Sequence, residues 1–370
     1  MRNSFLFILI LAAVALASCS SGISSGRQGE GDTLTLKYAR LLTLVDYGDY
    51  RTVSIADPWK KGRILHTYVL VADTAAGHLP EGTVVKVPLR RTVAFSTTHA
   101  ALMADLGRMA GLCGLSDVRY VKREDLRRAL DKGDVKDVGN GFQPDIEKII
   151  DLSPDGLLVS PFENSGGYGK LEELQVPVIE CADYMESSPL ARAEWMRFFG
   201  MLFGCEATAD SLFEVVEMRY DSLKAVAAGE SGRPKVMVDL PTSGMWYVPG
   251  GRSTIGEMIA DAGGDYCFGD NDHSGSVPMA IEKVLDRCEQ ADIWLFRYGG
   301  TAVNMEQLAK DNAGFRHLKA FGDSCLYGCS TERSTFYEST PFRPDFLLED
   351  FIGMFHSGRT AALRFFERIN

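Results

Sequence analysis

The chain has 370 residues, of which 45% are apolar and 24% charged, the composition of a globular protein long enough to bury a core in each of two domains. Its 39 Lys and Arg against 50 Asp and Glu give a formal net charge of −11. We therefore expect no nucleic-acid partner, because an acidic surface repels phosphates. The eight cysteines are too few for a disulfide scaffold, and no paired CxxC motifs indicate structural zinc.

The amino terminus has the pattern of a secretory signal. Arg2 precedes an apolar run over 5–16, which is too short to span a membrane. Leu16-Ala17-Ser18-Cys19 looks like a bacterial lipobox, in which the cysteine is acylated and becomes the mature terminus. We predict a signal peptide over 1–18 and lipidation at Cys19, so that acyl chains alone attach the protein to a membrane. The alternative is an ordinary signal with a chance cysteine.

A polar tether and a β-rich segment follow. Residues 19–33 are rich in Ser and Gly, which is typical of a flexible lipidated tether. The G-x-S-x-G pattern at 22–26 has no meaning there, because that hydrolase motif requires a strand-turn-helix. An N-terminal extension over 34–87 is predicted to form a small antiparallel sheet from β-branched and aromatic runs at 34–36, 42–45, 52–55 and 67–71.

From residue 88 onward, predicted strands alternate with predicted helices, which favours parallel sheets covered on both faces. Strands are expected at 92–95, 118–121, 156–160, 176–181, 235–240 and 291–296. Helices are expected at 96–106, before 156, and at 170–175, 254–262, 305–310 and 345–355. Between these two regions, apolar residues recur at helical spacing over 189–228, with one break near Gly204.

The two alternating regions resemble each other. Residues 145–159 and 280–295 each carry Ile-Glu-Lys in a short helix that runs into a buried strand. We predict an α/β fold of two similar three-layer lobes with parallel sheets, over 88–187 and 230–370, joined by one long helix over 188–229. Ligands of such sheets bind beyond the carboxyl ends of the strands, so a cleft between the lobes is expected.

Several segments resemble the periplasmic substrate-binding proteins of iron-siderophore, haem and cobalamin importers, including lipid-anchored members with a β-rich extension. They lie at 91–100, 146–155, 171–179, 188–195, 246–251, 259–265 and 342–345. The resemblance implies a rigid two-lobed protein of the periplasm, without enzymatic activity or cofactor, that delivers its ligand to an inner-membrane ABC permease. It also implies docking on that permease through one glutamate per lobe, here Glu147 and Glu282, since paired carboxylates can meet separate basic patches.

The ligand site is expected on loops that follow strands, where aromatic and cationic side chains suit a large chelate. Each aromatic could instead be a core residue, and His99 a polar wall residue. His99 and His273 come from opposite lobes and could together hold a metal or a haem. A bare metal site is not expected, because the six histidines form no ligand doublet. The predicted ligand-binding residues are Ser96, Thr97, His99, Phe162, Tyr168, Trp246, His273, Arg297 and Tyr337.

Four arginines favour an anionic iron chelate over the second candidate, cobalamin, and over haem. They are Arg192, Arg297, Arg333 and Arg343. A lipid-anchored hydrolase using Ser96 with His99, or Glu163 with Asp183, is a weaker alternative, because no third orienting group or oxyanion hole is evident. A binding protein that feeds a surface sensor or an outer-membrane receptor is a further alternative.

Leaving out Cys19 from the eight cysteines gives seven, an odd number for an oxidising compartment. Cys325 and Cys329 could close a small disulfide loop, or both could be reduced thiols, because short loops often have poor bridge geometry.

Overall fold

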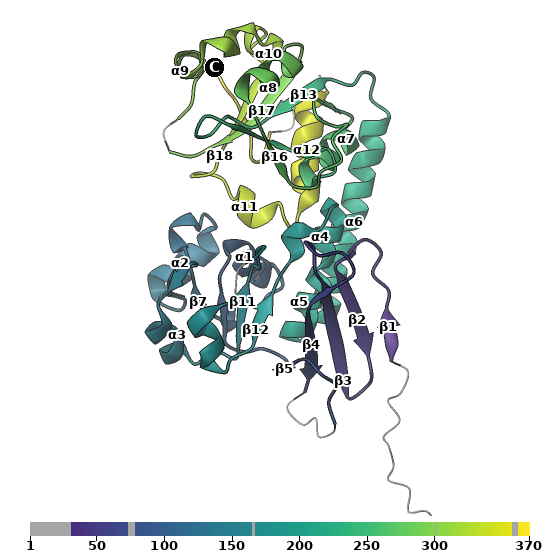
Figure 1. Ribbon diagram of the computed structural model, residues 1–370, viewed down its shortest axis with the longest axis vertical. Helices are drawn as coiled ribbons and strands as arrows, with labels where there is room; N and C mark the ends of the chain where they lie inside the picture. Colours follow the sequence, from purple (N-terminus) through teal and green to yellow (C-terminus); the bar gives the residue numbers. More distant parts are fainter. Residues whose placement is uncertain (1–30, 73–77, 165–166, 301, 357–361) are drawn as a thin grey trace, which may run out of the picture.

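A computed structural model describes residues 31–72, 78–164, 167–300, 302–356 and 362–370. The predictions for residues 1–30, which include the signal peptide and Cys19, lie outside these residues. In the described part, two α/β lobes lie one above the other in Figure 1, and a β-sheet extension lies beside the lower lobe.

The extension is a five-stranded sheet with the order β1-β2-β3-β4-β5. The first four strands are antiparallel, as predicted, and β5 adds a parallel strand that the sequence did not indicate. Gly48 makes the turn between β2 and β3, where its positive φ of 85° suits a residue without a Cβ. The strands are β1 (Asp32–Leu34), β2 (Leu42–Asp46), β3 (Tyr50–Ala56), β4 (Ile64–Val71) and β5 (Thr83–Lys86).

The first lobe has a fully parallel sheet with the order β12-β11-β6-β7-β8. Its strands are β6 (Thr92–Ala94), β7 (Leu112–Leu115), β8 (Lys136–Asp137), β11 (Gly156–Val159) and β12 (Val178–Glu180). A small hairpin, β9 (Gly139–Asn140) and β10 (Gln143–Pro144), stands beside it. The helices are α1 (Thr97–Asp105), α2 (Glu124–Lys132) and α3 (Ile146–Leu152), with short 3-10 turns at Met109–Gly111, Val118–Tyr120, Gly169–Leu174 and Asp183–Met185.

The second lobe has the sheet order β15-β13-β17-β18-β19, in which β19 alone is antiparallel among the described strands. The strands are β13 (Lys235–Val238), β15 (Asp265–Tyr266), β17 (Ile293–Tyr298), β18 (Leu326–Ser330) and β19 (Glu367–Arg368). A separate two-stranded antiparallel sheet consists of β14 (Trp246–Pro249) and β16 (Ser276–Met279). The helices are α7 (Thr254–Asp261), α8 (Ile281–Cys288), α9 (Met305–Asp311), α10 (Lys319–Gly322), α11 (Phe336–Ser339) and α12 (Pro344–Phe355), with a 3-10 turn at Ala313–His317.

The two lobes share a strand order. If the edge strand β8 of the first lobe is left out, each sheet pairs its second strand with its first, its first with its third, and its third with its fourth: β7-β6-β11-β12 and β15-β13-β17-β18. The helix that carries Ile-Glu-Lys precedes the third of these strands in both lobes, as α3 before β11 and α8 before β17. The prediction of two similar α/β lobes is therefore confirmed.

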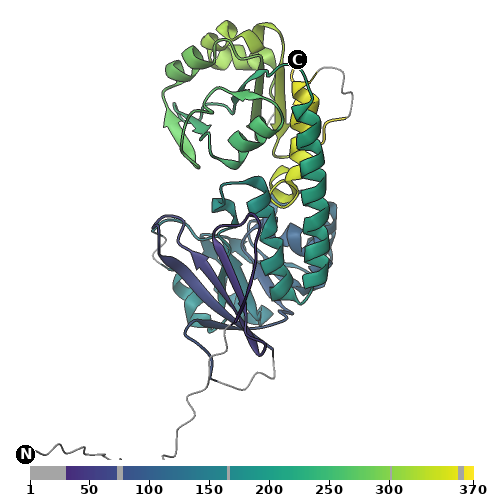
Figure 2. The ribbon, with the colours of Figure 1, turned by 90° about the vertical axis from the view of Figure 1, so that its right-hand side faces the viewer.

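The connection between the lobes differs from the nearly continuous helix predicted over 189–228. It consists of α4 (Pro189–Glu194), α5 (Met196–Phe203) and α6 (Glu206–Ala228). Gly204 adopts a left-handed conformation with a φ of 60°, which ends α5 and lets it lie against α6. The 23 residues of α6, about 34 Å of helix, form the single long connector, and α12 packs along it (Figure 2).

The strand predicted at 118–121 is wrong. Those residues follow Asp117, whose positive φ of 53° bends the chain, and they form a 3-10 turn. The strand lies earlier, in β7, where Gly114 obscured its β propensity. A Cβ on Gly114 would lie 2.9 Å from side-chain carbons of Leu152 and Val138, so the glycine lets these residues approach the sheet.

Two buried carboxylates hold the extension against the start of the linking helices. Glu194 is fully buried and accepts hydrogen bonds from the backbone N–H groups of residues 37–39 at 2.8–2.9 Å. Glu186 accepts from the N–H groups of residues 40 and 41 at 2.9–3.1 Å, and from Nε1 of Trp195 at 2.9 Å. A buried carboxylate is stable only when hydrogen-bond donors surround it, so each of these two carboxylates needs the backbone N–H groups of the extension. Those N–H groups in turn need the carboxylates as acceptors.

We expect Glu194→Ala to lower the free energy of unfolding by about 3 kcal/mol. Three backbone N–H groups would lose their buried acceptor, at a cost of roughly 1 kcal/mol or more each. Urea denaturation measures this, with Glu214→Ala on the exposed side of α6 as the control. Equal effects of the two substitutions would contradict the role of Glu194.

Candidate functional site

A pocket of about 320 Å³ lies between the two lobes, as expected from the fold. The first lobe contributes residues at the start of α1 and in the segment before α2, and the second lobe contributes the loop after β18 together with α11. The residues that line the pocket are Thr97, Tyr120, Lys122, Thr331, Glu332, Ser334, Tyr337 and Glu338. Thr97 and Tyr337 are two of the predicted ligand-binding residues, and the structure brings them together.

Hydrogen bonds cross between the lobes beside this pocket. Both carboxylate oxygens of Glu338 accept backbone N–H groups of the first lobe, from Lys122 at 3.0 Å and Arg123 at 2.9 Å. The hydroxyl of Thr98 donates to the carbonyl oxygen of Tyr337 at 2.8 Å. Burial raises the pKa of Glu338, although these two N–H groups oppose the rise. These hydrogen bonds therefore fix the walls of the pocket to each other.

The charges in the pocket belong to Lys122, Glu332 and Glu338. Nζ of Lys122 lies 3.0 Å from Oε2 of Glu332, and only 9% of the Lys122 side chain is exposed. The pocket therefore holds both signs of charge, with a cation already paired across the two lobes.

The four arginines that favoured an anionic ligand are all paired with carboxylates. Arg297 makes a two-pronged contact with Asp239, at 3.0 and 2.6 Å, and lies 5.9 Å from the centre of the Tyr337 ring. Its pKa is raised, because the Asp239 carboxylate outweighs the opposing effect of burial. The other three pairs are Arg192 with Asp183, Arg343 with Asp345, and Arg333 with Glu367. These pairs remove much of the argument for an anionic chelate.

Residues 93–329 match the sequence model of the periplasmic binding protein family, which is well over half of the chain. The chain belongs to this family. Periplasmic binding proteins of this type carry solutes and are not enzymes. The resemblance found in the sequence is thereby confirmed at the level of the family.

This periplasmic binding protein is also similar to individual proteins in sequence and in structure. An uncharacterized lipoprotein of Methanocaldococcus jannaschii is 28% identical over 285 residues, which is 74% of this chain; the alignment spans 66% of that relative, just under two thirds of its length. A periplasmic heme binding protein from Pseudomonas aeruginosa has a TM-score of 0.59 at 17% identity, covering 76% of this chain and 98% of the other. A periplasmic vitamin B12 binding protein of Vibrio cholerae has a TM-score of 0.53 at 15% identity, covering 72% and 96%. These two structures show a common fold.

The structure places His99 in the interior of the first lobe, not at the pocket. The residue is 1% exposed, and its Nε2 lies 2.9 Å from Oδ1 of Asp183. Nε of Arg192 donates to the other oxygen of Asp183 at 2.9 Å. Burial alone would raise the pKa of Asp183, but Arg192 and His99 hold it below its ordinary value. His99 is thus a partner in a buried ionic network and cannot grip a ligand together with His273, which is exposed on a loop of the second lobe.

Neither of the predicted hydrolase pairs has the geometry of a catalytic pair. Ser96 caps α1, with its hydroxyl accepting the N–H of Thr98 at 3.2 Å, while His99 is engaged by Asp183. Glu163 is exposed, and the carboxylate of Asp183 is buried between His99 and Arg192. Ser96 therefore serves to start the helix whose first residue lines the pocket.

Trp246 is a core residue, so its assignment to the ligand site is corrected. Its indole is fully buried and donates to the carbonyl oxygen of Val238 at 3.0 Å. The ring packs against Trp294 and Phe315, with centroids 6.0 and 6.1 Å away. Trp246 lies on β14 of the two-stranded antiparallel sheet, and the aromatic rings of the lobe cover its indole.

Tyr168 was predicted to lie in the cleft between the lobes, but it does not line the pocket there. It lines a hollow of about 520 Å³ between the extension and the first lobe. Its hydroxyl donates to Oε1 of Glu180 at 2.8 Å, and Nδ1 of His66 lies 3.1 Å from the other oxygen of Glu180. Burial is the main cause that raises the pKa of Tyr168, which keeps the phenol protonated as a donor.

Phe162 is exposed on the loop after β11, as predicted. Its side chain pairs with that of Phe142, and the two ring centres are 6.2 Å apart. Phe142 belongs to the β9–β10 turn, whose Gly141 N–H donates to Asp117 at 2.9 Å, just before the turn that carries Tyr120. Phe142 and Phe162 thus form an exposed aromatic pair on the first lobe, outside the residues that line the pocket.

Sequence reasoning missed five residues that line the pocket: Tyr120, Lys122, Thr331, Glu332 and Glu338. The loop 331–335 follows the carboxyl end of β18, so the rule that loops after strands bind ligands would have identified Thr331 and Glu332 once that strand was placed. Tyr120 had no such signal, because it lay inside the strand predicted at 118–121, which is a 3-10 turn.

The predicted docking glutamates occupy equivalent places. Glu147 is the second residue of α3 and Glu282 the second residue of α8, and both are exposed. Since these helices precede topologically matching strands, the two carboxylates stand at corresponding positions of the two lobes.

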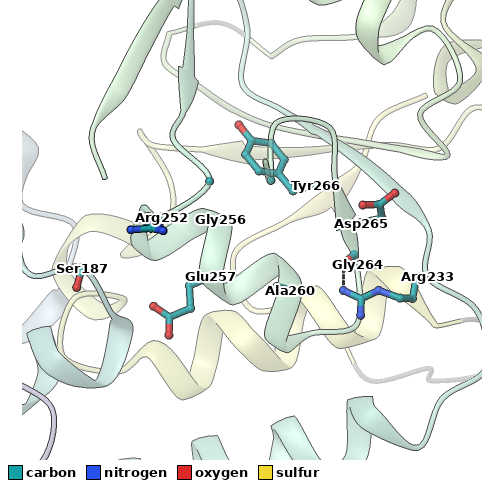
Figure 3. Close-up of a pocket in the computed structure, with 11 residues that line it drawn as sticks. Ser187, Arg233, Arg252, Gly256, Glu257, Ala260, Gly264, Asp265 and Tyr266 are labelled. Atoms are coloured by element: carbon teal, nitrogen blue, oxygen red, sulfur yellow. Dashed lines mark hydrogen bonds between the residues drawn. The ribbon is translucent and has the colours of Figure 1, made fainter. Parts of the chain in front are cut away.

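A further hollow of about 560 Å³ lies along α7 of the second lobe and reaches Ser187 before the linking helices (Figure 3). Glu257 of α7 and Arg252 both line this hollow. Burial, with help from the charge of Asp261, raises the pKa of Glu257 to about 7. Close backbone packing forms one side, because a Cβ on Gly251 would lie 2.5 Å from the carbonyl oxygens of Asn271 and Gly269.

Within the described residues, no three His, Cys, Asp or Glu side chains gather as a metal site. Over the same ranges, none of the helices combines the length and apolar character needed to cross a membrane.

The proposed bridge between Cys325 and Cys329 does not fit the structure. Residues 326–330 form the extended strand β18, so the two α-carbons lie about 13 Å apart, well beyond the span of a disulfide. Both cysteines are free thiols.

Proposed function

We propose that this periplasmic binding protein is the lipid-anchored solute receptor of an ABC importer. It captures a ferric chelate in the pocket between its lobes and passes it to an inner-membrane permease. The observation that carries the proposal is the pocket itself, which both lobes line and which cross-lobe hydrogen bonds hold in place. Acyl chains on Cys19 would hold the protein at the membrane surface, and the lipoprotein relative from Methanocaldococcus jannaschii supports this anchor.

The side chains at the pocket favour a chelate with flat groups and little net charge. Tyr120 and Tyr337 are each about half exposed and offer ring faces to a ligand in the pocket. Because carboxylates neutralise the nearby arginines, a strongly anionic chelate would find few free cations. A corrinoid is the second candidate, since the same rings could pack against its macrocycle. The names of the structural neighbours, for heme and vitamin B12, support a metal chelate as the ligand class.

We expect a ferric chelate to quench the tryptophan fluorescence of protein that starts at Ser20, in a panel that also contains haemin and cyanocobalamin. Tyr337→Ala should raise the Kd about tenfold, because loss of one stacking ring costs about 1.4 kcal/mol. Tyr47→Ala, in the turn after β2 of the extension, is the control and should leave the Kd unchanged. Binding of cyanocobalamin alone would make the corrinoid the ligand, and an unchanged Kd in Tyr337→Ala would contradict binding in this pocket.

Reversal of both docking charges, in a Glu147→Lys/Glu282→Lys variant, should abolish uptake of the ligand into cells while the Kd stays the same. The carboxylates would engage basic patches on the permease, and lysines there would repel those patches. Glu306→Lys is a control on α9, where the side chain is 76% exposed. Normal uptake by the double variant would refute this docking mode.

A further inference from the structure

Lys122 carries the one positive charge among the described residues that line the pocket between the lobes. Its Nζ lies 3.0 Å from Oε2 of Glu332 and donates to the carbonyl oxygen of Arg119 at 3.4 Å. Its backbone N–H donates to the carboxylate of Glu338 at 3.0 Å, which fixes the start of the side chain as well. The ammonium group is therefore held at the wall of the pocket.

The two partners of this ion pair differ in their contact with solvent. Only 9% of the Lys122 side chain is exposed, whereas 48% of the Glu332 side chain is exposed. A largely buried ammonium group needs an opposite charge beside it, because it has lost most of its hydration. A half-exposed carboxylate can return to water at little cost, because exposed ion pairs contribute little stability. The pair can therefore open on the side of Glu332 when another anion takes its place beside Lys122.

Two arginines of the lobes are paired differently. Both oxygens of Asp239 accept hydrogen bonds from Arg297, and both residues belong to the second lobe. Arg123 is paired with two carboxylates of its own lobe, the first. Neither guanidinium belongs to the residues that line the pocket, whereas Lys122 and Glu332 both do, and they come from opposite lobes. A ligand in the pocket therefore meets the pair of Lys122 and Glu332 directly.

We propose that Lys122 recognises a carboxylate of the ligand and that Glu332 competes with this carboxylate for the ammonium group. The inference rests on the proposed function and narrows its ligand class to a chelate that carries one acidic group beside its flat part. Exchange keeps the charges paired, because the ligand's carboxylate replaces that of Glu332, which turns to solvent on the loop 331–335. One cation with one displaceable partner suits a single acidic group.

The test compares the Kd values of matched ligands that differ in one acidic group. Ferric desferrioxamine B is capped on its amine with a succinyl group, which adds a carboxylate, or with an acetyl group, which adds none. Cyanocobalamin is compared with its monocarboxylic acid, in which one amide is hydrolysed. The full chain, extracted from membranes, is titrated with each ligand by calorimetry. The measured quantity is the ratio of the two Kd values in a pair, because changes that affect both forms alike cancel.

For a chelate that binds, we expect the acidic form to bind about tenfold more tightly than the neutral form, because it gains a hydrogen bond between charged groups. Lys122→Met should abolish this preference. Glu332→Gln should increase it, because a neutral amide competes less well for the ammonium group than a carboxylate does. Glu306→Gln on α9 is the matched control: it removes a carboxylate that is paired with Lys310 at the surface, and the preference should stay the same.

A purely structural ion pair predicts a different result for Glu332→Gln, since its loss would weaken both forms of a ligand and leave their ratio unchanged. That result, or equal Kd values for the two forms in the unaltered protein, would overturn the inference and leave the proposed function in place. Failure of every chelate to bind would overturn both. Glu332→Gln changes one half-exposed side chain, so the test does not depend on the folding of Lys122→Met.

Discussion

The carboxylate of Glu338 holds the two lobes in register. It comes from α11 of the second lobe, and its two oxygens accept the N–H groups of Lys122 and Arg123 in the first. Removal of either side would leave buried polar groups without partners, so the contact resists opening. Thr98 adds a hydrogen bond to the backbone of the same short helix. The pocket beside these groups is thus a product of the contact between the lobes.

The helices α6 and α12 also favour a rigid arrangement of the two lobes. One long helix, α6, connects the lobes, and α12 of the second lobe packs along it, so the connection bends less readily than a loop. The extension adds to the rigidity of the first lobe through the buried carboxylates of Glu186 and Glu194. A receptor with such a frame would present the same surface to a permease with and without ligand, and the equivalent positions of Glu147 and Glu282 suit that use.

Much of the fold could be predicted from the sequence, because it depends on local periodicity and on a repeat. The alternation of apolar strands and helices predicted the lobes, and Ser96 marked the start of α1 through a cap that involves only neighbouring residues. The pocket was harder to predict, because side-chain direction depends on distant partners. His99 turns inward to Asp183, 84 residues away, and Trp246 is buried by rings of other elements. The sequence around His99 or Trp246 does not indicate these distant partners.

Charge is a second quantity that the sequence shows only in part. Four arginines suggested an anionic ligand, but the sequence does not show which cations are already neutralised. Arg297 meets Asp239 across 58 residues, a pairing that the parallel sheet creates. The pair of Arg343 and Asp345 is only two residues apart and could have been suspected.

Hydrogen–deuterium exchange of the ligand-free protein tests the closed contact between the lobes most directly. The account predicts strong protection of the backbone amides of Lys122 and Arg123, comparable to that of amides in the central strands β6 and β11. Exchange of these two amides at the rate of an exposed loop would show that the lobes separate freely, and it would contradict a pocket held together by the hydrogen bonds of Glu338.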